Sequence, residues 1–167
     1  MDNLLRREQL HEYQVYCVEY IKKHSITALF LDCGLGKTVI SLTAINDLML
    51  EEFSVSKVLV IAPIRVTNVW VNESEHWEHL SNLIISRVVG DQKARIAALN
   101  TPANIYVTNR EVIKWLIEYY EKNGLKWDFD MVVIDELSSF KNHQSQRFKW
   151  LRKVRPFVKR FVGLTGT

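Results

Sequence analysis

Apolar residues along the chain fall into two alternating kinds of segment. Short, nearly continuous runs such as ITALFL (26–31), KVLVIAP (57–63) and MVVID (131–135) are typical of strands buried on both faces of a sheet. Longer segments with apolar residues three and four positions apart, such as KTVISLTAINDLML (37–50), are typical of helices. This alternation predicts an α/β fold with a mainly parallel sheet sandwiched by helices.

The remaining segments continue the same pattern. We expect further helices at about 7–23, 65–77, 92–99 and 110–122, and further strands at 83–89, 104–108 and 161–165. Asp91 is predicted to cap the helix that follows it, and Thr108 with Glu111 forms a capping-box pattern. The five tryptophans are expected to pack in the core or between helices. No repeat or linker-like tract interrupts the pattern, so we predict one domain over residues 1–167.

The composition indicates a soluble globular protein but does not by itself indicate a function. The 167 residues are 47% hydrophobic and 25% charged, as in soluble globular proteins. No apolar run approaches the ~20 residues of a membrane helix, and the two cysteines form neither a disulfide framework nor a metal-ligand spacing. We therefore expect a cytoplasmic protein. Residues 141–160, the basic segment, hold 8 of the 22 Lys and Arg and no acid, which suits either nucleic acid or a solvated helix face.

A glycine-rich turn between a predicted strand and a predicted helix carries the first chemical signal. Backbone N–H groups and the helix dipole converge there on one point, which favours a phosphate group. Lys37 would pair with the phosphates and the Thr38 hydroxyl would bind Mg²⁺. Leu31 stands where the strict phosphate-loop pattern has glycine, at a strand end where the main chain matters more than the side chain. A turn without a ligand is the alternative. The residues expected to bind the nucleotide are Cys33, Gly34, Leu35, Gly36, Lys37 and Thr38.

Two acids at the end of another apolar strand complete the predicted site. Asp135 and Glu136 follow the run at 131–134, and the carboxyl ends of parallel strands share one edge of the sheet. We predict that Asp135 binds Mg²⁺ and that Glu136 is the general base that polarises the attacking water. A helix N-cap followed by a first-turn acid would have the same sequence, so this assignment depends on the glycine-rich loop.

Together these motifs resemble the first RecA-like lobe of superfamily 2 helicases, and more narrowly the Swi/Snf-type DNA translocases. DELSSFKNHQSQ (135–146) is similar to the family pattern D-E-A-H-R-[IL]-K-N-x-x-S-K, and CGLGKT (33–38) is similar to M-G-L-G-K-T. Other motifs follow in family order over about residues 10–167: LHEYQ (10–14), VLVIAPIRVTNVWVNE (58–73), VTNREVI (107–113) and VGLTGT (162–167).

The resemblance implies a RecA-like P-loop NTPase lobe that uses ATP and Mg²⁺ and moves along DNA, touching mainly the backbone of a duplex. Glu136 and Lys37 would be its catalytic residues, and Gln14 would read adenine. It also implies a second RecA-like lobe after Thr167, so we expect residues 1–167 alone to turn over very slowly. The residues implied for nucleic-acid contact or coupling are Pro63, Arg65, Thr108, Asn109, Lys141, Asn142, Thr165 and Thr167.

Two departures from the family pattern leave other functions open. Leu137 and Ser138 stand where the family has alanine and histidine, and a hydroxyl cannot carry the charge of an imidazole. One alternative is a P-loop protein of another class, such as a small kinase or a ring-forming ATPase. The other is a nucleic-acid-binding module with a degenerate nucleotide site.

Overall fold

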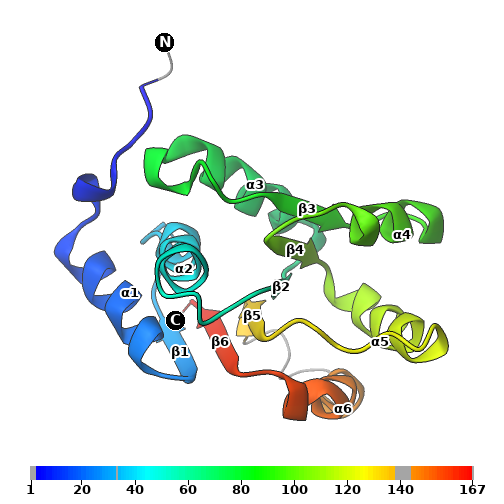
Figure 1. Cartoon of the computed structure of the whole chain (residues 1–167). Helices are drawn as coiled ribbons and strands as arrows, with labels where there is room; N and C mark the ends of the chain where they lie inside the picture. The colour runs from blue at the N-terminus through cyan, green and yellow to red at the C-terminus, as the bar shows by residue number, and fades with distance from the viewer. Residues whose placement is uncertain (1–2, 33, 138–143, 167) are drawn as a thin grey trace.

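The structure consists of a six-stranded sheet with helices on both faces (Figure 1). It is a computed structural model that describes residues 3–32, 34–137 and 144–166. The strands are β1 (Ile26–Phe30), β2 (Val58–Ile61), β3 (Ile85–Val88), β4 (Ile105–Thr108), β5 (Met131–Asp135) and β6 (Arg160–Thr165). The longer helices are α1 (Glu12–Lys23), α2 (Lys37–Asn46), α3 (Thr67–His76), α4 (Gln92–Asn100), α5 (Ile113–Lys122) and α6 (Gln144–Val154). The short helical segments are η1 (Arg7–Gln9), η2 (Asp47–Glu51), η3 (Ile64–Val66), η4 (Glu78–Leu80), η5 (Arg110–Val112) and η7 (Arg155–Phe157).

The order of the strands differs from their order along the chain. It is β1-β6-β5-β2-β4-β3, and every neighbouring pair is parallel. Parallel neighbours need crossover connections, and helices supply most of them. The predicted α/β class, with a mainly parallel sheet between helices, is therefore confirmed.

Each face of the sheet has its own apolar core. On the first face, α1, α2 and α3 pack over strand residues such as Val60, Val133 and Leu164. On the second face, α5 and α6 pack over residues such as Leu59 and Val132. Successive strand residues point to opposite faces, so neighbours in one strand belong to different cores. Within the described chain, no helix combines the length and the apolar character that a membrane crossing demands.

Strand β1 differs from the prediction that it is buried on both faces. Thr27 and Leu29 are buried, but Ile26, Ala28 and Phe30 are exposed. The strand lies at the edge of the sheet, where helices cover only its first face. The apolar run therefore misled the prediction, because burial depends on strand order and the run does not reveal that order.

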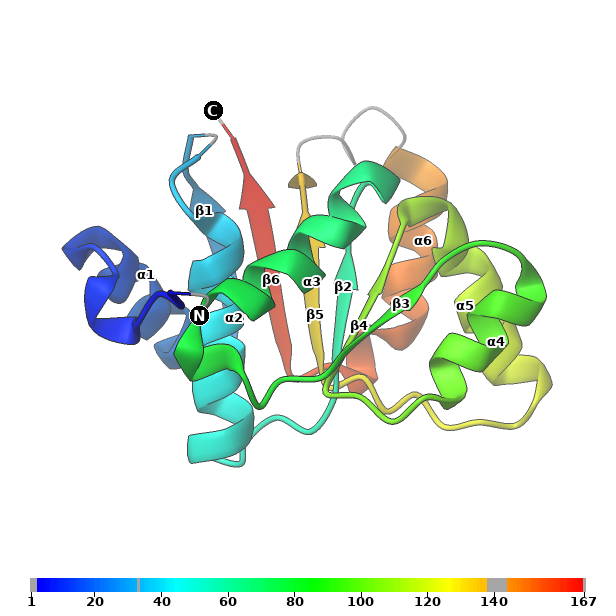
Figure 2. The ribbon, with the colours of Figure 1, turned by 90° about the horizontal axis from the view of Figure 1, so that it is seen from above.

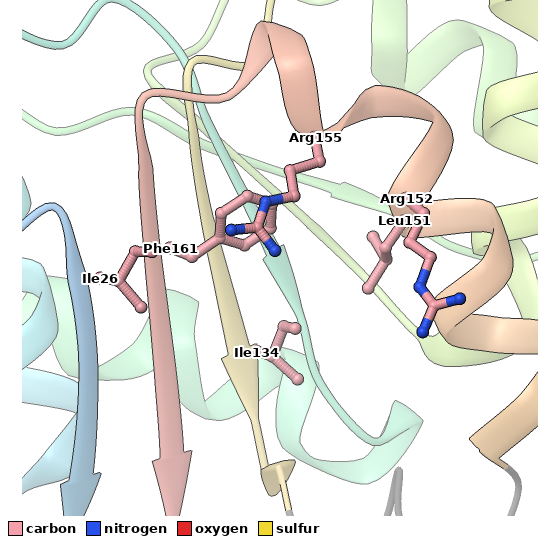
Figure 3. A pocket seen from close by; sticks show the side chains of 6 residues that line it. All are labelled: Ile26, Ile134, Leu151, Arg152, Arg155 and Phe161. Carbon is pink, nitrogen blue, oxygen red and sulfur yellow. The ribbon is translucent and has the colours of Figure 1, made fainter.

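A cavity of about 280 Å³ lies on the second face, beside β6 and α6 (Figure 3). Its lining combines apolar side chains with two arginines: Ile26, Ile134, Leu151, Phe161, Arg152 and Arg155. None of these residues is among those predicted for the nucleotide site.

The first predicted helix is divided in two. After η1 the backbone is extended for two residues before α1 begins. A glutamine caps each helix, since Gln9 Oε1 accepts from Arg6 N and Gln14 Oε1 accepts from His11 N, both at 2.8 Å. These amides start the two helices separately, which the apolar periodicity does not reveal.

Of the two predicted helix caps, one is confirmed and one is wrong. Asp91 Oδ1 accepts a hydrogen bond from Ala94 N at 2.8 Å at the start of α4. Thr108 instead ends β4, and its hydroxyl donates to Val88 O at 2.7 Å. Asn109 becomes the residue before η5. The buried hydroxyl finds its partner across the sheet, and this tertiary bond replaces the local cap.

The basic segment continues from α6 through η7 into β6. Arg160 donates to main-chain oxygens at the end of α1, those of Ile21, Lys22 and His24. This guanidinium therefore holds two elements together and caps a helix. Contact of the remaining basic residues with a polyanion stays a prediction.

Candidate nucleotide site

The carboxyl ends of the strands meet at one edge of the sheet (Figure 2). Because β6 lies between β1 and β5, the segments that follow these three strands are neighbours at that edge. Leu31 N donates to Thr165 O at 3.1 Å, which joins the start of the glycine-rich loop to the end of β6. Parallel sheets bind ligands at this edge. The structure therefore brings the predicted loop and the predicted acids together.

The glycine-rich turn leads directly into α2. Gly34 and Gly36 have φ angles of 86° and 84°, in the left-handed region that favours glycine. Gly36 O accepts from Ile40 N at 3.0 Å, so the helix begins within the turn. The first N–H groups of a helix have no intrahelical acceptor, and the helix dipole attracts anions to them. The strand, turn and helix expected of a phosphate loop are all present.

Gln14 packs against this loop from α1. The residue is buried, and its Nε2 donates to Leu35 O at 3.2 Å. Tyr13 Oη donates to the same oxygen at 2.8 Å. A Cβ on Gly36 would lie 2.3 Å from Gln14 Nε2, so this approach requires glycine. An amide nitrogen carries a second N–H, which the predicted contact with adenine would use.

Lys37 is the first residue of α2, and its ammonium group reaches the end of β6. The position of a Cβ on Gly166 lies 3.8 Å from Lys37 Nζ. Thr38 follows in the first turn, and both residues are half-buried. Thr165 is buried, and its hydroxyl donates to Gly166 O at 3.1 Å. Lys37, the predicted phosphate-binding lysine, therefore lies next to the end of the last strand. The hydroxyl of Thr165 is hydrogen-bonded to the adjacent residue.

Asp135 ends β5 as a carboxylate that is only 6% exposed. Its Oδ2 accepts a hydrogen bond from Trp70 Nε1 at 3.0 Å. Burial raises the pKa of Asp135 and the neighbouring Glu136 adds to the rise, against the opposing effects of the Trp70 hydrogen bond and the Lys37 charge. The net rise means that these surroundings disfavour the negative charge, and a bound cation would reverse that effect.

Glu136 follows in an uncommon backbone conformation. Its φ of 58° lies in the left-handed region, although the residue is not glycine. Its Oε1 lies 3.3 Å from Arg65 Nη2. Strained residues of this kind persist where the surrounding structure holds them, and they cluster at active sites. The ion pair links the predicted general base to a residue predicted to contact nucleic acid.

The residue after the two acids packs onto the neighbouring strand. A Cβ on Gly163 would lie 2.7 Å from Leu137 Cδ2, so this leucine fits because β6 has glycine there. Leu137 stands where the family pattern has alanine. Its larger side chain connects the acidic segment to the strand that ends in Thr165.

Four residues predicted for nucleic-acid contact or coupling lie at or just after the carboxyl ends of the neighbouring strands β2 and β4. Pro63 is buried, and Thr108 is buried with its hydroxyl bonded inside the sheet. Asn109 is half-buried and donates to Glu111 Oε2 at 2.7 Å. The Arg65 side chain is 73% exposed. Arg65 is therefore the one of these four that is best placed to reach a ligand in solvent.

Several predicted residues lie outside the part of the chain that the structure describes. They are Cys33 in the loop, Lys141 and Asn142 after the acids, and Thr167. Ser138, which replaces the family histidine, lies outside it too. The roles assigned to them stay predictions.

Trp70 belongs to the site, although the sequence predicts it only as a core residue. The residue is fully buried, as expected, but its N–H group reaches the acid of β5. Its place within the motif-like segment 58–73 was the signal available in the sequence. The partner was not predictable, because the two residues are 65 positions apart.

The residues at this edge fit Mg²⁺ better than a metal that needs a full set of protein ligands. Among the described residues, no group of three or more His, Cys, Asp or Glu side chains could enclose an ion. Magnesium is usually held by one or two carboxylates together with substrate phosphates and water. Asp135 and the Thr38 hydroxyl suit that mode of binding.

Comparison with known proteins agrees with this geometry. The sequence profile of the SNF2-related domain matches residues 12–167. Putative protein p41 of Acyrthosiphon pisum secondary endosymbiont phage 1 is 33% identical over 93% of this chain and 35% of its own length. The chromodomain-helicase-DNA-binding protein 3 homolog of Caenorhabditis elegans is 29% identical over 95% of this chain and 10% of its own length. The chain thus spans about a third or less of these relatives.

A solved structure shares the fold over the whole chain. The SWI2/SNF2 ATPase core of Sulfolobus solfataricus, determined in complex with double-stranded DNA, superposes with a TM-score of 0.76 at 23% identity. The match covers 100% of this chain and 34% of that one, and it confirms the predicted RecA-like fold. Since the family profile matches all but the first 11 residues, the chain belongs to the SNF2-related domain family.

Proposed function

We propose that this chain is the nucleotide-binding lobe of an ATPase that hydrolyses ATP while it moves along duplex DNA. The observation that supports this most strongly is the buried Asp135 carboxylate at the same sheet edge as Lys37 and the glycine-rich loop. The ATPase and DNA complex named for the Sulfolobus relative, and the DNA binding named for the C. elegans relative, agree with it.

The residues of the site divide the chemistry among them. The N–H groups at the start of α2 and the Lys37 ammonium bind the phosphates. The Thr38 hydroxyl and the Asp135 carboxylate hold Mg²⁺, which when bound neutralises charge on the phosphate oxygens. Glu136 orients a water molecule and accepts its proton as the oxygen attacks the terminal phosphorus. The bond to the ADP oxygen breaks, so ADP and phosphate leave.

Arg65 would couple this chemistry to DNA. Its guanidinium is exposed and lies next to the Glu136 carboxylate. A DNA phosphate would compete for the same guanidinium, because arginine binds phosphate through two parallel hydrogen bonds. When Arg65 turns to DNA, Glu136 would lose this ion pair, and its carboxylate could then turn towards the water. DNA binding at the outer edge would thereby raise the rate of hydrolysis.

We also propose that a second RecA-like lobe completes the site in the protein that contains this chain. The relatives are about three or more times longer than the matched region. Arginines supplied from outside a nucleotide-binding lobe contribute ~10³ or more in rate in related ATPases. Hydrolysis by residues 1–167 alone should therefore be very slow.

Nucleotide binding by residues 1–167 tests the proposal. A non-hydrolysable ATP analogue with Mg²⁺ should bind the wild type in a calorimetric titration, and Lys37→Ala should lose this binding. Lys93→Ala is the control, because Lys93 is exposed on α4. No binding by the wild type at millimolar nucleotide would favour the alternative of a degenerate nucleotide site. Rapid DNA-stimulated hydrolysis by residues 1–167, lost in Lys37→Ala, would contradict the need for a second lobe.

A further inference from the structure

An indole contacts the carboxylate assigned to magnesium. Trp70 projects from α3 on the first face, and its Nε1 donates to Asp135 Oδ2 at 3.0 Å. Trp70 is 0% exposed and Asp135 is 6% exposed, so solvent does not compete for this bond. A hydrogen bond to a charged acceptor inside a protein is stronger than a neutral one.

The partner of Trp70 is informative because the indole has few choices. An indole N–H can only donate, and a buried one needs an acceptor. Many buried indoles satisfy this need with a main-chain oxygen, as Trp127 does with Phe129 O at 3.1 Å. Trp70 instead reaches a carboxylate on another element, 65 residues further along the chain. The bond restricts the rotation of the carboxylate at the point where β5 ends.

We propose that Trp70 is a positioning residue for the Mg²⁺ that accompanies ATP. It holds the Asp135 carboxylate in one orientation, with Oδ2 bound to the indole, so that the cation meets a preformed ligand. This inference rests on the proposed function. Partners that orient metal ligands typically change metal affinity by 10–100-fold when they are removed.

The chain contains a matched control for this role. Trp77, just beyond the end of α3, donates its Nε1 to Glu73 Oε1, also at 3.0 Å. It is a buried tryptophan bonded to a carboxylate, like Trp70, and is 7% exposed. Its partner lies one helical turn away and is not part of the nucleotide site. Trp77→Phe thus makes the same chemical change without touching Asp135.

The first test compares Trp70→Phe with Trp77→Phe. Phenylalanine keeps an aromatic ring and removes the N–H group. We would measure the affinity for the ATP analogue with Mg²⁺ and again with EDTA, and take the ratio as the magnesium-dependent gain. Trp70→Phe should lower this gain about tenfold or more and leave the affinity in EDTA unchanged. Trp77→Phe should change neither quantity.

Two results would overturn the inference. One is a magnesium-dependent gain in Trp70→Phe that equals the gain of the wild type. The other is an equal loss of affinity with and without Mg²⁺, which would mean that Trp70 supports the loop or the fold and not the carboxylate. Absence of any gain in the wild type is a different outcome, since it removes the proposed function and this inference together.

The second test needs no variant at position 70. In ¹⁵N-labelled protein with the ATP analogue, Mn²⁺ in place of Mg²⁺ should broaden the indole N–H resonance of Trp70 because the paramagnetic ion binds next to its partner. The Trp77 resonance should broaden far less, because Trp77 lies seven residues further along the chain and paramagnetic broadening falls steeply with distance, and Asp135→Asn should abolish the strong broadening at Trp70. Equal behaviour of the two resonances would contradict the inference, whatever the stability of Trp70→Phe.

Discussion

Asp47 and Asp135 are both buried aspartates, but the surroundings of Asp47 stabilise its negative charge and those of Asp135 destabilise it. The Asp47 side chain is 0% exposed and receives two bonds from Arg7, at 2.6 and 2.7 Å, and one from Lys22 at 3.1 Å. Burial alone would raise the pKa of Asp47, but the bonds from Arg7 and Lys22 outweigh it and lower the pKa. Asp135 has a neutral indole as its hydrogen-bonding side chain, and its pKa is raised.

The difference separates a structural carboxylate from one suited to bind a cation. Buried charges in proteins are paired or coordinate metals. Asp47 is paired with Arg7 of η1 and Lys22 of α1, so it fastens these elements to the end of α2. Asp135 lies at a strand end with too little positive charge to offset its burial. Of the two carboxylates, the buried and weakly compensated Asp135 is therefore the one that a bound cation would stabilise more.

Removing the charge of Asp47 should have the largest effect on stability. Asp47→Asn leaves Arg7 and Lys22 without their carboxylate, and breaking a buried ion pair costs about 3 kcal/mol or more. We expect this fall in the free energy of unfolding in urea at neutral pH, with little change in the affinity of the folded protein for nucleotide. Asp128→Asn is the control, because Asp128 pairs with Lys57 at 3.0 Å but is 54% exposed. Equal losses of stability in both variants would contradict the claim that the buried ion pairs of Asp47 contribute more than an exposed pair.

The same change at Asp135 should act in the opposite sense. Asp135→Asn removes a disfavoured charge and keeps an oxygen that can accept from Trp70. The free energy of unfolding should stay the same or rise by up to about 1 kcal/mol, because a neutral amide is easier to bury. The magnesium-dependent gain in nucleotide affinity should disappear, as titrations with Mg²⁺ and with EDTA would show. A loss of stability comparable to that of Asp47→Asn would break the comparison, since Asp135 would then be structural too.

Acid titration of the metal-free protein should separate the two carboxylates by sign. The pKa of Asp47 is lowered by folding, so its stabilisation is present above the ordinary value of about 3.9 and is lost as the pH falls through the lowered pKa. The pKa of Asp135 is raised, so its destabilisation is complete above that raised pKa and fades as the pH falls through it.

The matching variants test these signs. Urea unfolding between about pH 3 and pH 7 should show a flatter acid limb in Asp47→Asn, and Asp135→Asn should lose the rise in stability that the wild type shows on mild acidification. Each unit of pKa shift corresponds to about 1.4 kcal/mol, so these effects are smaller than the full loss of the Asp47 pairs. Parallel pH curves for the wild type and both variants would contradict the assigned directions.

Much of the fold could be predicted from the sequence, because local patterns determine it. Apolar runs located the six strands, and the glycine-rich turn had to follow a strand and open a helix. Lys37 follows the turn after β1 and Asp135 ends β5, so both were expected at one edge, since parallel strands share their carboxyl edge. These inferences used only neighbouring residues and one rule about parallel sheets.

What could not be predicted depends on contacts between distant segments. The partners of Asp47 and Asp135 come from other helices, and no local pattern gives their packing. The exposed side of β1 follows from its place at the sheet edge, which strand order decides. Thr108 does not cap the following helix for a similar reason, since its hydroxyl donates to Val88 O, a buried partner on another strand. Tertiary hydrogen bonds prevailed over local signals in each case.

Glu136 extends the comparison to a partly exposed acid, and its partner gives the smallest expected effect on stability. The Arg65 and Glu136 side chains are 73% and 38% exposed, so their pair should contribute less than about 0.5 kcal/mol to the free energy of unfolding. In the two-lobed protein that we propose, Arg65→Ala should nevertheless change coupling. Hydrolysis without DNA should rise a few-fold, because Glu136 no longer pairs with Arg65. The stimulation by duplex DNA should fall. Lys93→Ala, an exposed position on α4 outside the basic segment, is the control for a lost positive charge. Unchanged DNA-free hydrolysis in Arg65→Ala, measured by phosphate release, would mean that the ion pair does not restrain Glu136.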